Sequence, residues 1–167
     1  DVQLEMASYL EQQGFNTSET VGMMTAVTTE HADVEEYKGD FGSVVIAVTA
    51  GVGNAVDVSE ALTRDRKHKV GTINTWVIVN GQLPDEAFIQ AMITATEAKT
   101  KALQTEEVKD PLTGTIATGT STDSLLVAAT QYGEYLPYAG PITELGKLVG
   151  HGVYECTVRA LRAYKKA

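Results

Sequence analysis

The segment from residue 72 to residue 104 constrains the fold more than any other part of the chain. Residues 72–80 alternate between an apolar and a more polar side, which predicts a half-buried strand. The apolar side carries Ile73, Val77 and Val79, and the other side carries Thr72, Asn74 and Trp76. Pro84 and two carboxylates then open a helix, because proline fits the first turn and acidic groups favour its positive end. Phe88, Met92 and several alanines give this helix an apolar stripe, which predicts that it packs on the sheet.

The rest of the chain alternates between the same two kinds of pattern. We predict a helix over 4–13, two or three antiparallel strands within 21–29 and 34–49, a strand over 124–130 covered on both faces, and a helix over 140–164 with Ile142 on its inner side. This order predicts an α+β fold in one domain, residues 1–167, with a mixed, mostly antiparallel sheet and helices packed on it. Because the sequence begins at Asp1 without a methionine, we also expect an upstream segment in the gene product.

Composition narrows the partners and the compartment. The 167 residues include 22 Asp and Glu against 13 Lys and Arg, and a net charge of −9 disfavours binding to nucleic acid. No apolar run reaches the roughly 20 residues that a membrane-spanning helix needs, so we expect no membrane insertion. Cys156 is the single cysteine, so the fold needs no disulfide and a cytoplasmic location is expected. Self-association into a homo-oligomer remains open.

Two glycine- or threonine-rich segments are candidates for a binding site. Gly51, Gly53 and Asn54 follow a strand directly, where small residues allow backbone amides to approach a ligand, although a plain turn explains them equally well. The second segment, residues 117–123, places hydroxyl groups and the Asp123 carboxylate before an apolar strand. Asp123 fits a general base or a group that orients a hydroxyl nucleophile, and the alternative is a carboxylate that only bonds loop amides.

Three further features carry weaker signals. Glu97 fits either a catalytic carboxylate or a surface pair with Lys101. His151 and Glu155 lie one helical turn apart, which suits acid–base chemistry, but two ligands do not make a metal site, so we predict no protein-bound metal. Glycines at 146, 150 and 152 predict close packing around His151. The aromatic rings of Tyr135 and Tyr138 suit either a flat ligand or ordinary surface packing.

The ordered set of motifs resembles the adenosylcobinamide amidohydrolases. The residues that carry the resemblance are 71–75, 93–100 and 117–123, together with the turn at 50–55 and the stretch at 140–151. The resemblance covers roughly residues 44–158. It implies hydrolysis of the amide that joins the aminopropanol arm to the corrin ring, giving adenosylcobyric acid and aminopropanol during corrinoid salvage. The cobalt would arrive with the substrate, so no cofactor held by protein ligands is expected.

Amide hydrolysis requires an activated nucleophile, donors for the oxyanion and an acid for the leaving amine. We therefore expect Asp123 or Glu97 as the base for water, His151 as the acid, and Asn74 with the amides of residues 119–121 as oxyanion donors. In a rival mechanism a hydroxyl group is the nucleophile, from Thr120, Ser121 or Thr72. The expected substrate contacts are Gly51, Gly53, Asn54, Thr72, Gly119, Ser121, Thr122, Tyr135 and Tyr138.

Two other classes of function compete with the enzyme. One is a corrinoid-binding module of a larger fusion protein, which would hold cobinamide without cleaving it. The other is an acidic structural or assembly domain without a ligand. Binding of a corrinoid separates the first from the second, and release of aminopropanol separates the enzyme from both.

Overall fold

A four-stranded sheet forms the centre of the computed structural model, which describes residues 2–63 and 70–166. Its strands are β1 (Asp33–Gly39), β2 (Gly42–Gly51), β4 (Thr72–Asn80) and β6 (Ser124–Ala129), and they lie in the order β1-β2-β4-β6. The first three strands pair antiparallel, and β6 runs parallel to β4. Two short strands, β3 (Ala55–Val56) and β5 (Gly119–Thr120), pair with each other beyond the main sheet.

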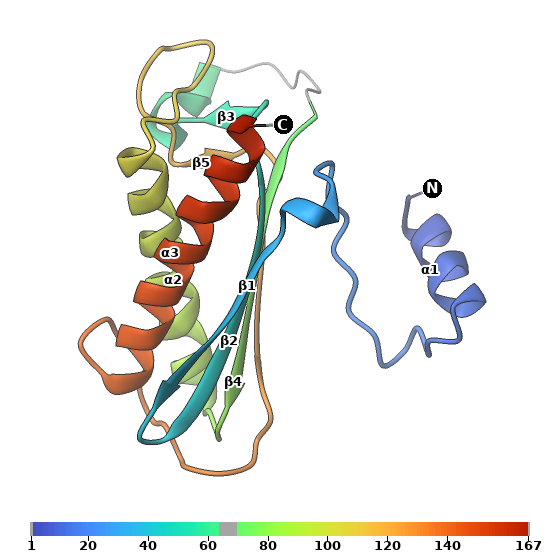
Figure 1. The fold of residues 1–167 in the computed structure, drawn as a ribbon, viewed down its shortest axis with the longest axis vertical. Coiled ribbons are helices and arrows are strands. Elements are labelled where there is room, and N and C mark those ends of the chain that lie inside the picture. Colours follow the sequence, from blue (N-terminus) through green and yellow to red (C-terminus); the bar gives the residue numbers. More distant parts are fainter. Residues whose placement is uncertain (1, 64–69, 167) are drawn as a thin grey trace.

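Two long helices, α2 (Asp85–Thr105) and α3 (Glu144–Lys166), lie side by side on one face of this sheet (Figure 1). The register sets Val44, Ile46 and Val48 of β2 opposite Val79, Val77 and Thr75 of β4, and all six are buried. From α2 the buried side chains are mostly alanines, which allow close approach to the neighbouring elements. The predicted α+β fold, with a mixed and mostly antiparallel sheet, is confirmed.

The amino-terminal part differs from the prediction. Helix α1 (Val2–Gln12) forms where expected and stands apart from the sheet and the two long helices (Figure 1). The predicted strand over 21–29 is wrong, since residues 21–28 form no strand and 29–31 form a short 3-10 helix, η1. Both edges of β2 are already taken by β1 and β4. The segment is held instead by a side chain, because Asn74 Nδ2 donates to the Met24 carbonyl at 2.7 Å.

Two predictions about the carboxy-terminal half are also wrong. The last helix begins at Glu144 rather than at Gly140, because the Thr143 hydroxyl caps it by accepting a bond from the Gly146 amide at 3.0 Å. Ile142 therefore lies outside the helix and is 85% exposed. Strand β6, at an edge of the sheet, is not covered on both faces, since its residues 125–129 are only half-buried.

A second 3-10 helix, η2 (Val58–Thr63), follows β3. Within the described residues, no helix is long and apolar enough to cross a membrane.

Candidate active site

The parallel pairing of β6 with β4 brings the loop before β6 against the first residues of β4. Asp123 ends that loop, and its Oδ1 accepts three hydrogen bonds. The donors are the Ile73 amide at 3.2 Å, the Thr120 amide at 3.1 Å and the Thr120 hydroxyl at 2.5 Å. The Asp123 carboxylate is thus held by two strands and fixed in one orientation.

Helix α2 supplies the charge that faces this carboxylate. Lys99 Nζ lies 2.5 Å from Asp123 Oδ2, and the two side chains are only 15% and 19% exposed. Gly119 makes room for the pair, because a Cβ atom there would lie 2.5 Å from Asp123 Oδ2 and 3.0 Å from Lys99 Nζ. This packing explains Gly119 without a ligand, so its contact with a substrate stays a prediction.

A cleft of about 220 Å³ opens beside this ion pair, between α2 and the start of β6. Its lining residues are Ile73, Thr75, Met92, Ala95, Thr96, Lys99, Asp123, Ser124 and Leu125. The lining of the cleft thus combines a carboxylate, an ammonium group and hydroxyls with apolar side chains. A carboxylate can take a proton and an ammonium can stabilise a developing negative charge, so the arrangement suits hydrolysis of a polar bond.

Four of the predicted substrate contacts hold the loop before Asp123 in place. The Thr72 hydroxyl donates to the Thr122 carbonyl at 2.7 Å, and the Thr122 hydroxyl donates to the Gly71 carbonyl at 2.7 Å. Asn54 Nδ2 donates to the Ser121 hydroxyl at 2.8 Å. These bonds position the Asp123 loop against the turn after β2, while direct contact of these residues with a substrate stays a prediction.

Gly51 and Gly53 allow the chain to pack closely at that turn. A Cβ atom on Gly51 would lie 2.4 Å from Val27 Cγ2, and one on Gly53 would lie 2.7 Å from the Val70 carbonyl oxygen. This packing explains both glycines without a ligand, so their contact with a substrate also stays a prediction.

The structure places Glu97 and Asn74 away from the cleft. Glu97 is exposed and lies two residues from Lys99, a rotation of about 200° around the helix, so it faces away from Asp123. Asn74 lies on the face of the sheet opposite Ile73, where it bonds the Met24 carbonyl. Their predicted roles as base and oxyanion donor have no support from this arrangement.

His151 lies on α3 against β1, with its ring edge-on to that of Tyr37 and the ring centres 5.7 Å apart. This is the β1 edge of the sheet, whereas Asp123 is at the β6 edge. Close packing near His151 is confirmed at two of the three glycines: a Cβ atom on Gly146 would meet the Gly140 carbonyl oxygen and one on Gly152 would meet Tyr37, both under 3 Å. A Cβ atom on Gly150 would make only an ordinary contact, at 3.5 Å.

Tyr135 and Tyr138 follow β6, whereas Asp123 precedes it, and neither tyrosine lines the cleft. The two rings are 59% and 62% exposed. The structure therefore does not place the two tyrosines beside the Asp123 carboxylate, although both were predicted to belong to one site.

Sequence reasoning missed Lys99 as a partner of Asp123, although Lys99 lies in one of the motifs of the resemblance. The available signal was its place on α2: Lys99 follows Ala95 by one turn and Ala98 by one residue, at the border of the apolar stripe. A lysine at that border can bury its stem while its ammonium reaches a neighbouring element.

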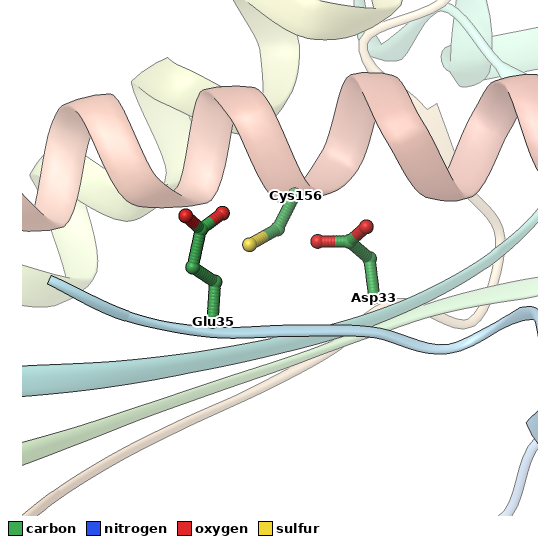
Figure 2. Close-up of side chains that lie close together, drawn as sticks. All are labelled: Asp33, Glu35 and Cys156. Atoms are coloured by element: carbon green, nitrogen blue, oxygen red, sulfur yellow. The ribbon is translucent and has the colours of Figure 1, made fainter.

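A second group of reactive side chains lies between β1 and α3 (Figure 2). Ligand atoms of Asp33, Glu35 and Cys156 lie within 4.8 Å of one another, the arrangement expected of a small metal site. The guanidinium of Arg159 already binds this group, at 2.9 and 2.8 Å from the two Asp33 oxygens and in contact with Glu35. We therefore assign the group to fastening the edge strand β1 onto α3.

The titration behaviour of this group agrees with a structural role. Burial raises the pKa of the Cys156 thiol to about 12, so it stays protonated at neutral pH. Burial also acts to raise the pKa of Asp33, but the hydrogen bonds from Arg159 and Cys156 outweigh it and hold that pKa below its usual value. A protonated thiol is a poor nucleophile and a poor metal ligand.

The fold and the cleft define an α+β domain whose candidate active site joins a lysine–aspartate pair to hydroxyl groups and an apolar wall. The chain belongs to the adenosylcobinamide amidohydrolase family, whose model matches residues 1–167. An adenosylcobinamide amidohydrolase of Methanosarcina mazei is 32% identical over 153 residues, which covers 85% of this chain and 66% of that protein. One of Halobacterium salinarum is 30% identical over 146 residues, covering 84% and 56%.

An uncharacterized protein of Methanocaldococcus jannaschii is 35% identical over 96 residues, which covers 57% of this chain and 37% of that protein. The chain thus spans between about a third and two thirds of the length of these relatives. No solved structure matches it.

Proposed function

We propose that this chain hydrolyses the amide between the aminopropanol arm and the corrin ring of adenosylcobinamide, giving adenosylcobyric acid and aminopropanol. The observation that carries the proposal is the Lys99–Asp123–Thr120 network beside a cleft, in a chain of the adenosylcobinamide amidohydrolase family. Cobalt arrives with the substrate, and the proposal gives it no ligand from the protein.

In the proposed mechanism Asp123 is the general base. Its carboxylate takes a proton from water, and the water oxygen attacks the amide carbon. The Lys99 ammonium, 2.5 Å from Asp123 Oδ2, donates a hydrogen bond to the oxygen that becomes negative. The proton on Asp123 then passes to the amine nitrogen as the carbon–nitrogen bond breaks, which regenerates the carboxylate.

Thr120 has a different role in each of the two mechanisms that the geometry allows. With water as nucleophile, its hydroxyl donates to Asp123 Oδ1 at 2.5 Å and orients the base. With Thr120 as nucleophile, Asp123 takes the hydroxyl proton and an ester to Thr120 forms, which water then hydrolyses. Thr120→Val separates the two: we expect slower hydrolysis in the first mechanism, and complete loss together with a mass-detectable ester in the wild type in the second.

The test of the proposal is release of aminopropanol from adenosylcobinamide by the purified chain, followed by mass spectrometry. We expect Asp123→Asn and Lys99→Met to lower kcat by about a hundredfold or more, because each removes a group that acts at the reacting bond. Lys101→Met is the matched control, since Lys101 is an exposed lysine on the same helix and its ammonium bonds Gln104, one turn along that helix.

Two results would contradict the proposal. If the wild type releases no aminopropanol, this chain is not the proposed hydrolase. Loss of activity in Glu97→Gln or His151→Gln, with Lys99→Met unaffected, would instead move the active site away from the cleft.

A further inference from the structure

The cleft is too small for the whole of the proposed substrate. Its volume of about 220 Å³ lies below the roughly 300–1000 Å³ of pockets that enclose drug-sized ligands, and a corrinoid is larger than those. The cleft therefore has room for the amide arm, and the macrocycle must lie on the surface beside it. We propose that the corrin ring rests on the outer apolar face of α2, formed by Ile89, Met92 and Ile93. This inference rests on the proposed function.

These three residues form a continuous surface. They are spaced three and four residues apart on α2, so their side chains adjoin on the helix. Ile89, Met92 and Ile93 are 60%, 44% and 54% exposed. Met92 was expected to point inward with the alanines, and its exposure is a departure from that prediction. Single exposed apolar residues are ordinary, whereas a contiguous group of large ones is typical of a binding surface.

The apolar face of α2 is continuous with the cleft. Met92 belongs to both, because it lines the cleft as well as the outer face. Thr96 and Lys99 follow Met92 by one and two turns of the same helix and also line the cleft. A ligand lying on Ile89 and Ile93 can therefore extend an arm past Met92 and Thr96 to the ion pair.

The chemistry of the two surfaces matches the two parts of a corrinoid. The macrocycle presents an extended plane with amide groups around its rim, which suits apolar side chains next to hydroxyls. The exposed residues Thr96 and Ser124 place hydroxyl groups on both sides of the cleft. The face of the sheet without helices is a less suitable binding surface for the ring, because it does not adjoin the cleft. Leu125 lines the cleft, whereas Leu126, the next residue, points to the opposite side of β6.

The test is the effect of Ile89→Gln and Ile93→Gln on steady-state kinetics with adenosylcobinamide. Glutamine is close in size to isoleucine and forms helix at least as well, but it replaces the apolar contact with a polar amide. We expect KM to rise about tenfold or more in each variant, with kcat within about twofold of the wild type. Ile142→Gln is the matched control, because Ile142 is 85% exposed and lies outside α2 and the cleft.

A second measurement separates binding from chemistry. Asp123→Asn should retain adenosylcobinamide binding, seen in the visible spectrum, and adding Ile93→Gln to it should weaken that binding by a similar factor. Wild-type kinetics in both isoleucine variants, with an active wild type, would overturn the corrin seat on α2 and leave the hydrolase intact. A wild type that neither binds nor cleaves adenosylcobinamide would overturn both.

Discussion

Replacing Lys99 by methionine removes the ammonium from the ion pair with Asp123 and keeps most of the aliphatic stem. The pair is largely buried, and a hydrogen bond to a charged group contributes about 1.5–3 kcal/mol. Removing one partner of a fully buried ion pair lowers stability by about 3–5 kcal/mol, because the other charge is left unpaired. Asp123 keeps the hydrogen bonds from Ile73 and Thr120, so the loss here is smaller. We therefore expect Lys99→Met to lower the free energy of unfolding by about 2 kcal/mol. At roughly 2–4 °C per kcal/mol for a domain of this size, Tm falls by about 4–8 °C.

Thermal melts of four proteins test this value: the wild type, Lys99→Met, Asp123→Asn and the double variant. If the pair forms in solution, the double variant loses less stability than the sum of the singles, by at least about 0.5 kcal/mol. Lys101→Met should stay within about 0.5 kcal/mol of the wild type, since it changes only a surface contact. Equal melting of Lys99→Met and Lys101→Met, or strict additivity in the cycle, would refute the ion pair.

Further predictions concern α3 and the edge strand. Gly146→Ala should destabilise the domain by about 1–3 kcal/mol in denaturant unfolding, because its Cβ atom would lie 1.8 Å from the Gly140 carbonyl oxygen. Gly150→Ala should stabilise it by about 0.5–1 kcal/mol, since its Cβ atom meets nothing closer than 3.5 Å, and equal effects at both sites would contradict the packing described. Because the pKa of Asp33 is lowered in the fold, its bond to Arg159 stabilises the domain above about pH 4 and is lost as the pH falls further. The difference in Tm between the wild type and Arg159→Gln should therefore narrow below about pH 4, and a constant difference down to pH 2 would argue against this linkage.

The sequence predicted an element correctly where its hydrophobic pattern alone shows which side is buried. The alternation over β4 and the apolar stripe on α2 predicted both elements and the burial of Ile73, Val77 and Val79, although Met92 of the stripe is exposed and the polar side of β4 is also buried at Thr72 and Asn74. Residues 21–29 have the β-branched composition of a strand, but composition does not determine strand pairing, and the segment is held instead by the Asn74 side chain at the Met24 carbonyl. The start of α3 was predictable from Thr143, whose hydroxyl is a common helix cap.

The site was predictable in part for a similar reason. Asp123 and Thr120 are three residues apart, so their contact is local and the sequence indicates it. Lys99 reaches Asp123 only because α2 packs across the start of β6, and a single sequence does not contain that geometry. The grouping of Asp123 with Tyr135, Glu97 and His151 failed because proximity in the chain, or matching chemistry, says nothing about which end or edge of a sheet a residue occupies.

The parallel pairing of β4 and β6 also has a consequence for the order of folding. Ile73 and Asp123 are 50 residues apart in the chain, and every parallel contact must wait until the intervening helix has closed the loop. Contacts of high sequence separation form slowly, because the chain entropy is lost before the contacts are made. The β1–β2 hairpin and α2 can be complete while Asp123 still lacks its β4 partner. We therefore expect a nascent or partly folded chain to have the β1–β2 hairpin and α2 before it has an oriented Asp123 carboxylate.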